Sequence, residues 1–165
     1  MRVLGIDPGS ETLGWGVIEG TGLKYAAVDF GTVRSDTKKA FSERLLTVYN
    51  GVADVIEKFG PDVVSIEDTF YAKNVSVAMK LGQVRGVILL LAGQRGIEIA
   101  EYAPRLIKQT IVGHGNAEKQ QVGEMVKLLL RLKAAPKPHD TADALAIAIC
   151  HFHHAGMRDR IAKAK

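Results

Sequence analysis

The chain has very little cysteine: Cys150 is the only one among its 165 residues. A single cysteine cannot form a disulfide within the chain, so the sequence excludes the small disulfide-stabilised folds of secreted proteins. Cys150 lies in an apolar stretch with helical periodicity, and we interpret it as a buried thiol. This use of cysteine is typical of a reducing compartment and predicts a cytoplasmic protein.

Hydrophobic runs long enough to cross a membrane are also missing. The strongly apolar run 87–92 is far shorter than the roughly 20 residues that a spanning helix needs, and Arg85 and Arg95 flank it. The first residues contain no apolar core of signal-peptide length before Asp7. We therefore expect no membrane association and assign the run 87–92 to the core or to an interface.

Low-complexity tracts and internal repeats are absent as well. A chain of this length matches one ordinary domain, which buries about 70% of the surface that its unfolded form exposes. We predict a single domain over 1–155 and a basic tail, 156–165, that is a candidate for disorder. The net charge of +4 and the pI near 9.2 permit nucleic-acid binding, although a solvated surface explains so small an excess equally well.

Hydrophobic periodicity predicts an α/β fold. The expected strands cover residues 3–7, 13–19, 23–33, 62–67 and 97–102. The expected helices cover 41–59, 74–95 and 117–132, with a short segment from Pro104 and a last helix from about Asp140. The first three strands should be antiparallel, and 62–67 should run parallel to 3–7 because a helix connects them. We expect a five-stranded mixed sheet with helices on both faces.

Four acidic residues form the most informative pattern. Asp7 and Glu67 each end an apolar strand, and Asp140 and Asp143 lie three residues apart after Pro138. Parallel strands that end level bring Asp7 and Glu67 together at the carboxyl edge of the sheet, where open sheets place their active sites. Acids gathered in one pocket repel one another unless a cation joins them, so the pattern predicts a divalent-metal site.

Each acid also has a simpler interpretation. Asp140 can cap the last helix and Asp143 can compensate its dipole, together worth about 0.3–2 kcal/mol. Asp7 can be a turn residue before Pro8, and Glu67 can be a surface acid. Neither alternative explains why Asp7 and Glu67 end apolar strands, where an unpaired buried acid is costly.

Several short motifs, taken together, are similar to those of a known family. They are residues 5–10, 14–16, 66–67, 72–74, 80–83, 85–86, 108–109, 117–119 and 140–146. This set resembles the RuvC family of bacterial Holliday-junction resolvases and spans nearly the whole chain. The resemblance implies an RNase H-like fold, a homodimer, and Mg²⁺-dependent paired symmetric nicks across a four-way DNA junction in recombination and repair. It also implies the RuvA and RuvB branch-migration proteins as partners.

The resemblance further implies that the catalytic metal ligands are Asp7, Glu67, Asp140 and Asp143. Four acids can hold two Mg²⁺ ions roughly 3.5–4 Å apart, with Mn²⁺ as a candidate substitute. One ion would help to generate hydroxide from water, and the other would stabilise charge on the departing sugar oxygen, leaving 5′-phosphate and 3′-hydroxyl ends. Asp68 should point out of this pocket, because neighbouring strand residues face opposite ways.

Candidate DNA contacts lie downstream of the acids. Basic candidates are Lys73, Lys80, Arg85, Arg105, Lys108 and Lys119. The resemblance favours Lys108 and Lys119, whereas a solvated charge is an equally good interpretation of each residue singly. Phe70 and Tyr71 follow Glu67 closely, where a ring could stack on an exposed base; core packing is the alternative for Phe70.

A helix face around Gly82 and Gly86 is the candidate dimer interface. The two glycines lie beside Leu89 and Leu90 and would let a second helix approach closely. Burial against the sheet is a comparably good interpretation of any one of these residues. We favour the interface because paired nicks on opposed strands need two active sites.

The histidines receive no metal role. The sequence around His151, His153 and His154 lacks the ligand spacing of a closed zinc site, so we interpret these residues as part of a solvated tail. His139 and His114 are interpreted as loop and turn residues.

Three other functions stay open. The motifs 7–10 and 14–16 resemble the phosphate loop of actin-like and sugar-kinase ATPases, but those enzymes close two related domains around the nucleotide and this chain has the length of one. A non-catalytic junction-binding module would use the acids structurally. A general RNase H-like nuclease would share the metal site and act on other branched or hybrid substrates.

Overall fold

A single five-stranded sheet organises the molecule. The structure, a computed structural model, describes residues 1–68 and 74–163, with 156–163 as backbone only. The sheet order is β3-β2-β1-β4-β5, in which β1 to β3 are antiparallel while β4 and β5 run parallel to β1. The strands are β1 (Arg2–Asp7), β2 (Thr12–Thr21), β3 (Lys24–Arg34), β4 (Val63–Glu67) and β5 (Glu98–Tyr102). The predicted mixed sheet is confirmed.

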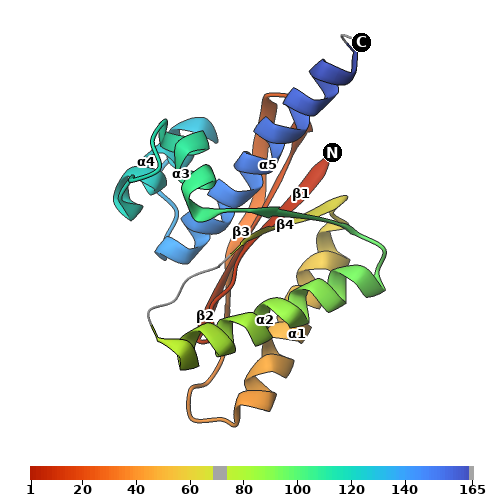
Figure 1. The fold of residues 1–165 in the computed structure, drawn as a ribbon, viewed down its shortest axis with the longest axis vertical. Coiled ribbons are helices and arrows are strands. Elements are labelled where there is room, and N and C mark those ends of the chain that lie inside the picture. Colours follow the sequence, from red (N-terminus) through yellow and green to blue (C-terminus); the bar gives the residue numbers. More distant parts are fainter. Residues whose placement is uncertain (69–73, 164–165) are drawn as a thin grey trace.

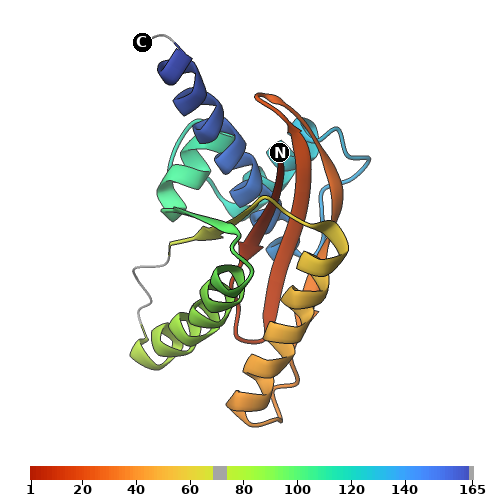
Figure 2. The same cartoon turned by 90° about the vertical axis from the view of Figure 1, so that its right-hand side faces the viewer.

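Helices cover both faces of this sheet, as predicted (Figure 1). They are α1 (Phe41–Phe59), α2 (Val75–Gln94), α3 (Pro104–Val112), α4 (Lys119–Leu129) and α5 (His139–Lys163). Figure 2 shows α1 and α2 on one side of the strands and α5 on the other. The chain therefore has two apolar layers, one between the sheet and α1–α2 and one between the sheet and α3–α5.

Alternation along the strands distributes the residues of β1 between these layers. Leu4 and Ile6 pack with α1 and α2, whereas Val3 packs with α3 to α5. Asp7, two residues beyond Gly5, consequently shares the face that α5 covers. In β4, Ser65 marks the same face, because its hydroxyl donates a 3.3 Å hydrogen bond to the carbonyl of Ile147 in α5.

The bounds of α4 and α5 differ from the sequence prediction. Helix α4 begins at Lys119 rather than 117, because the Gln121 side chain bonds back to the Glu118 N–H at 2.9 Å and closes the first turn. It ends at Leu129 rather than 132, because Arg131 adopts a left-handed φ of 53° that stops the helix. Helix α5 continues to Lys163, through most of the tail 156–165.

Continuation of α5 also corrects the interpretation of the histidines as a solvated tail. The helix keeps packing beyond Cys150, so His151 bonds Tyr102 at 3.1 Å and His153 bonds Tyr25 at 3.0 Å. His154 lies 3.3 Å from the Thr110 hydroxyl. These imidazoles are helix-packing residues.

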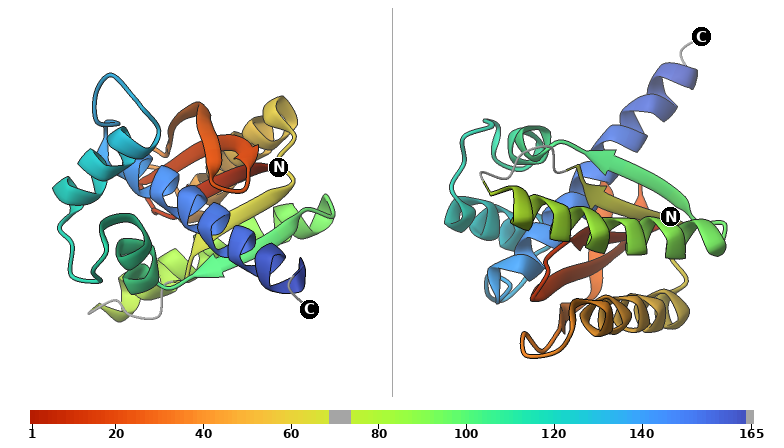
Figure 3. Two further views of the ribbon diagram at one scale, coloured as in Figure 1. Left: turned by 90° about the horizontal axis from the view of Figure 1, so that it is seen from above. Right: turned by 60° about the horizontal axis from the view of Figure 1, so that its bottom comes forward.

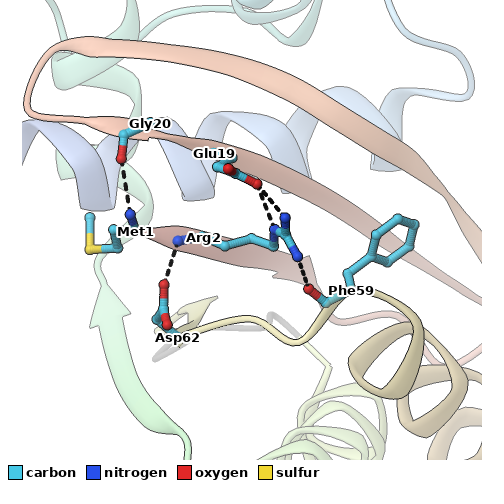
Figure 4. Close-up of polar contacts among 6 residues, drawn as sticks. All are labelled: Met1, Arg2, Glu19, Gly20, Phe59 and Asp62. Atoms are coloured by element: carbon cyan, nitrogen blue, oxygen red, sulfur yellow. Dashed lines mark hydrogen bonds and ion pairs between the residues drawn. The ribbon is translucent and has the colours of Figure 1, made fainter.

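A polar cluster fixes the start of β1, at the end of the strand away from Asp7 (Figure 4). The Arg2 amide donates to Asp62 at 2.7 Å, and its guanidinium binds the Glu19 carboxylate and the Phe59 carbonyl. These contacts join β1 to β2 and to the segment between α1 and β4. They hold β1 and β4 in one register, which sets where both strands end.

Glycines let α5 approach the sheet. A Cβ atom at Gly5 would lie 2.0 Å from the carbonyl oxygen of Ala144, and one at Gly14 would lie 2.0 Å from that of Asp140. Both distances are far below van der Waals contact, so any side chain there would push α5 outward. Figure 3 shows α5, in blue, crossing the strands of the sheet. The two glycines on β1 and β2 therefore set the position of the helix that carries Asp140 and Asp143.

We predict that Gly5→Ala lowers the free energy of unfolding by about 1–3 kcal/mol or more, because overpacking displaces backbone. Thermal unfolding measures this as a decrease in Tm of roughly 2–4 °C per kcal/mol for a domain of this size. Gly123→Ala is the matched control: this buried glycine also faces α5, but its Cβ would lie 3.9 Å from the nearest atom, in Ala142. Equal Tm values for the two variants would contradict the tight approach of α5.

Candidate active site

Strand register brings the first two acids together. β1 and β4 pair in parallel with Gly5 opposite Ser65 and Ile6 opposite Ile66, so Asp7 and Glu67 come next on adjacent strands. Both residues stand at the carboxyl edge of the sheet and on the face that α5 covers. The predicted placement of Asp7 and Glu67 on adjacent strand ends and on the same face of the sheet is confirmed.

Helix α5 brings the third acid to the same place. Asp7, Glu67 and Asp143 line one cavity of about 310 Å³. Lys108 from α3 and Lys119 from the start of α4 also line it, and apolar walls come from Pro104, Ile107, Val122, Ala146 and Ile147. Asp140 does not line the cavity, although its charge acts on Asp7. Asp68 lies outside, as alternation predicts.

Burial and mutual repulsion dominate the electrostatics of this cavity. Burial, followed by the charges of Asp143, Glu67 and Asp140, raises the pKa of Asp7 to about 8, and Lys119 opposes this shift. Burial and Asp143 likewise raise the pKa of Glu67, opposed by Lys119 and Lys108. Asp7 and Glu67 therefore hold protons more tightly than isolated acids do, because burial and neighbouring negative charge both disfavour their ionised forms.

Lys119 supplies part of the compensating charge. Its ammonium lies 3.1 Å from Asp143 and donates a hydrogen bond to it. Burial lowers the pKa of Lys119, but Asp143, Asp7 and Asp140 outweigh that effect and raise it overall. Because the Lys119 side chain is 66% exposed, it can also face a ligand outside the cavity.

The donor set fits a hard divalent cation. Carboxylate oxygens from three separate elements face one partly apolar cavity. Burial and the charge of Asp143 raise the pKa values of Asp7 and Glu67, and a bound cation would relieve both effects. Among the described side chains of residues 1–68 and 74–155, no three His, Cys, Asp or Glu residues are close enough to form a ready-made metal cluster. Asp7, Glu67 and Asp143 thus line one cavity, but their carboxylates lie farther apart than the ligands of a preformed metal site.

The predicted DNA-binding residues fall into three groups. Lys108 and Lys119 line the cavity, which supports the two that the resemblance favoured. Lys80 and Arg105 are exposed. Phe70, Tyr71 and Lys73 lie outside the described residues. A DNA role for all of these stays a prediction.

Arg85 has an environment that the sequence did not suggest. Its side chain is only 15% exposed, and it binds Asp68, Glu101 and the main-chain carbonyl of Glu67. Sequence reasoning considered this arginine as a phosphate contact and missed Glu101 entirely. Pairing of Arg85 with both Asp68 and Glu101 needs the sheet register between β4 and β5, which the sequence does not specify.

The predicted dimer residues lie on α2. Gly82, Gly86 and Leu90 are exposed, and no atom lies within 4 Å of a Cβ built at either glycine. Leu89 is partly buried against the apolar layer beneath α2. Met79, 63% exposed, adds to the outer surface. In the described part of the chain, α2 is the one helix with the length and hydropathy of a membrane span, a property that interface helices can share.

Comparisons with known proteins give one consistent result. Residues 3–151 match the family described as Crossover junction endodeoxyribonuclease RuvC. A protein of that name from Caldanaerobacter subterraneus subsp. tengcongensis is 47% identical over 98% of both chains, and one from Chloroflexus aggregans is 48% identical over 94% of both.

Solved structures agree with these relatives. T. thermophilus RuvC in complex with Holliday junction substrate superimposes with a TM-score of 0.90 at 37% identity, covering 96% of each chain. The yeast mitochondrial Holliday junction resolvase Ydc2, 16% identical, has a TM-score of 0.66 over 95% of this chain and 82% of that one, which shows a shared fold. The RNase H-like fold predicted from the sequence is confirmed.

The raised pKa of Asp7 predicts how the stability of the metal-free protein varies with pH. The folded state keeps a proton on Asp7 up to about pH 8, whereas the unfolded chain loses it near 3.8, so stability is fully present below pH 3.8 and falls as pH rises towards 8. Asp7→Asn should remove this loss. In EDTA, its Tm advantage over the wild type should grow steadily between pH 5 and pH 8, by roughly 2–4 °C for each kcal/mol of stability that the wild type loses.

Glu57→Gln, at an exposed acid on α1, is the matched control and should follow the wild type at every pH. Identical pH slopes for Asp7→Asn and the wild type would show that Asp7 ionises like an ordinary acid.

Proposed function

The chain belongs to the RuvC family of crossover junction endodeoxyribonucleases, and from this premise we propose that it resolves four-way DNA junctions by paired symmetric nicks. The observation that carries the proposal is the convergence of Asp7, Glu67 and Asp143 on one cavity that Lys108 and Lys119 also line. A negatively charged centre with a positive rim suits a metal-dependent reaction on a phosphodiester.

The proposed reaction is hydrolysis of a DNA phosphodiester that leaves 5′-phosphate and 3′-hydroxyl ends. Asp7 and Glu67, fixed on adjacent strands, would hold the metal from the sheet side, and Asp143 with Asp140 would hold it from α5. Two Mg²⁺ ions, for which Mn²⁺ can substitute, would supply an activated water and neutralise charge on the leaving oxygen. Lys108 and Lys119 would orient the scissile phosphate, since both amines line the cavity.

Symmetric cleavage of two strands calls for a homodimer, and the outer face of α2 is the proposed interface. Gly82 and Gly86 leave room for the close approach of a second helix. Leu90 and Met79 expose apolar surface that association would remove from water. A second copy would bury this face and place two cavities on one junction.

The alternative functions find less support. A binding module would have no need for buried acids that repel one another, because positive charge supplies affinity for DNA. An ATP-using enzyme needs a second related domain to close over the nucleotide, and residues 1–68 and 74–163 form a single sheet with its helices. By resemblance we also propose RuvA and RuvB as partners and the cytoplasm as the location.

We expect both Asp7→Asn and Glu67→Gln to abolish cleavage of a synthetic four-way junction at millimolar Mg²⁺. Binding should change by less than about threefold, because affinity comes mainly from basic residues. Denaturing gels report paired nicks and mobility shifts report binding, with Glu57→Gln as the control acid. Unimpaired cleavage by the two site variants would defeat the proposed reaction, and binding without cleavage by the wild type would favour the module.

For the dimer, we predict that Leu90→Glu lowers the mass measured by sedimentation equilibrium from twice 17.9 kDa towards 17.9 kDa. A buried charge opposes association, because it loses its hydration at the interface. Leu128→Glu is the matched control: Leu128 on α4 is 65% exposed, similar to the 59% of Leu90, yet lies away from α2. A wild type that sediments as a monomer, or equal effects of both variants, would contradict this interface.

A further inference from the structure

We propose that Arg85 is a positioning residue for the metal ligand Glu67, holding the end of β4 rather than contacting DNA. The inference rests on the proposed function in that Glu67 is taken to bind the metal. Its basis is a set of contacts that join α2, β4 and β5 at one point. Arg85 donates to the Glu67 carbonyl at 2.9 Å, lies 3.6 Å from the Asp68 carboxylate and binds the Glu101 carboxylate.

These contacts fix the main chain of Glu67 from the face of the sheet opposite to its carboxylate. Ile66 packs in the layer with α1 and α2, so the carboxylate of Glu67, the next residue, faces the α5 side and the cavity. Arg85 reaches from α2 to the backbone at the same residue. The Arg85 guanidinium on the α2 face of the sheet thereby fixes the backbone of Glu67, whose carboxylate lies on the α5 face.

Glu67 needs such support because β4 ends there. One hydrogen bond continues the strand pairing beyond Glu67, from the Asp68 N–H to the Tyr102 carbonyl, at 2.8 Å. Glu67 also shares its cavity with Asp7 and Asp143, two further acids that repel its carboxylate. Without a fixed backbone, the side chain could turn towards solvent and relieve that repulsion.

Arg85 is poorly suited to a phosphate contact. Two carboxylates already compensate its charge, and its side chain is 15% exposed, against 66% for Lys119. The planar guanidinium can serve a carbonyl and two carboxylates at once, which a lysine ammonium cannot do with the same geometry. The residue type therefore matches a fixed, multi-partner role.

The test compares metal binding with DNA binding in the full chain. Mn²⁺ binding to the DNA-free protein is measured by electron paramagnetic resonance, and junction affinity is measured in EDTA over a range of salt concentrations. For Arg85→Gln we expect the Mn²⁺ dissociation constant to rise about 10-fold or more, the usual effect of losing a residue that supports a metal ligand. Junction affinity in EDTA and its salt dependence should stay at wild-type values.

Arg95→Gln is the matched control, because Arg95 is an exposed arginine at the end of the same helix. It should bind Mn²⁺ like the wild type. Arg85→Lys should recover part of the affinity that Arg85→Gln loses. If Arg85→Gln fails to fold, Glu101→Gln serves instead, since it keeps the arginine and removes one anchor; it should weaken Mn²⁺ binding in the same direction.

Two outcomes would overturn the proposal. One is wild-type Mn²⁺ affinity in both Arg85→Gln and Glu101→Gln. The other is unchanged Mn²⁺ affinity in Arg85→Gln with a salt slope reduced by about one, which marks a lost phosphate contact. If Arg85→Gln binds Mn²⁺ more weakly than the wild type while the wild type cuts no junction, the positioning role is supported and the proposed function is refuted. The two failures are therefore distinguishable.

Discussion

The close approach of α5 to β1 and β2 is the constraint on which the site depends. Gly5 and Gly14 have no side chains, so the carbonyls of Ala144 and Asp140 occupy space that a Cβ atom would fill. The helix that carries two of the acids thus lies directly against the strand that ends in the first. Without that contact, Asp7 and Asp143 would belong to separate surfaces.

Convergence has an electrostatic cost that the fold offsets only in part. Burial and repulsion raise the pKa of Asp7 to about 8. Lys119 compensates Asp143, but within the part of the chain that the structure describes neither Asp7 nor Glu67 has a direct ion pair of its own. Arg85 is close to Glu67 but binds its backbone, not its carboxylate. Arg85 and Lys119 therefore stabilise the residues around the cavity, and a bound cation would compensate the charge of Asp7 and Glu67 inside it.

Much of this arrangement could be predicted from the sequence, and the remainder has identifiable physical reasons. Period-two and helical spacing are local signals, so they located the five strands and the faces of Asp7 and Glu67. The partners of Arg85 depend on how β5 pairs with β4, a long-range contact, and Glu101 had no signal of its own. The packed histidines were misjudged because the length of α5 beyond Cys150 depends on tertiary contacts with Tyr102 and Tyr25.

Diffraction from crystals soaked in Mn²⁺ tests most directly whether α5 and the sheet together form a metal site. Anomalous scattering locates the ion without reference to activity. The account predicts a strong peak in the cavity, within coordination distance of carboxylate oxygens from β1, β4 and α5. A cavity without anomalous signal at millimolar Mn²⁺, or a peak bound by acids of α5 alone, would contradict it.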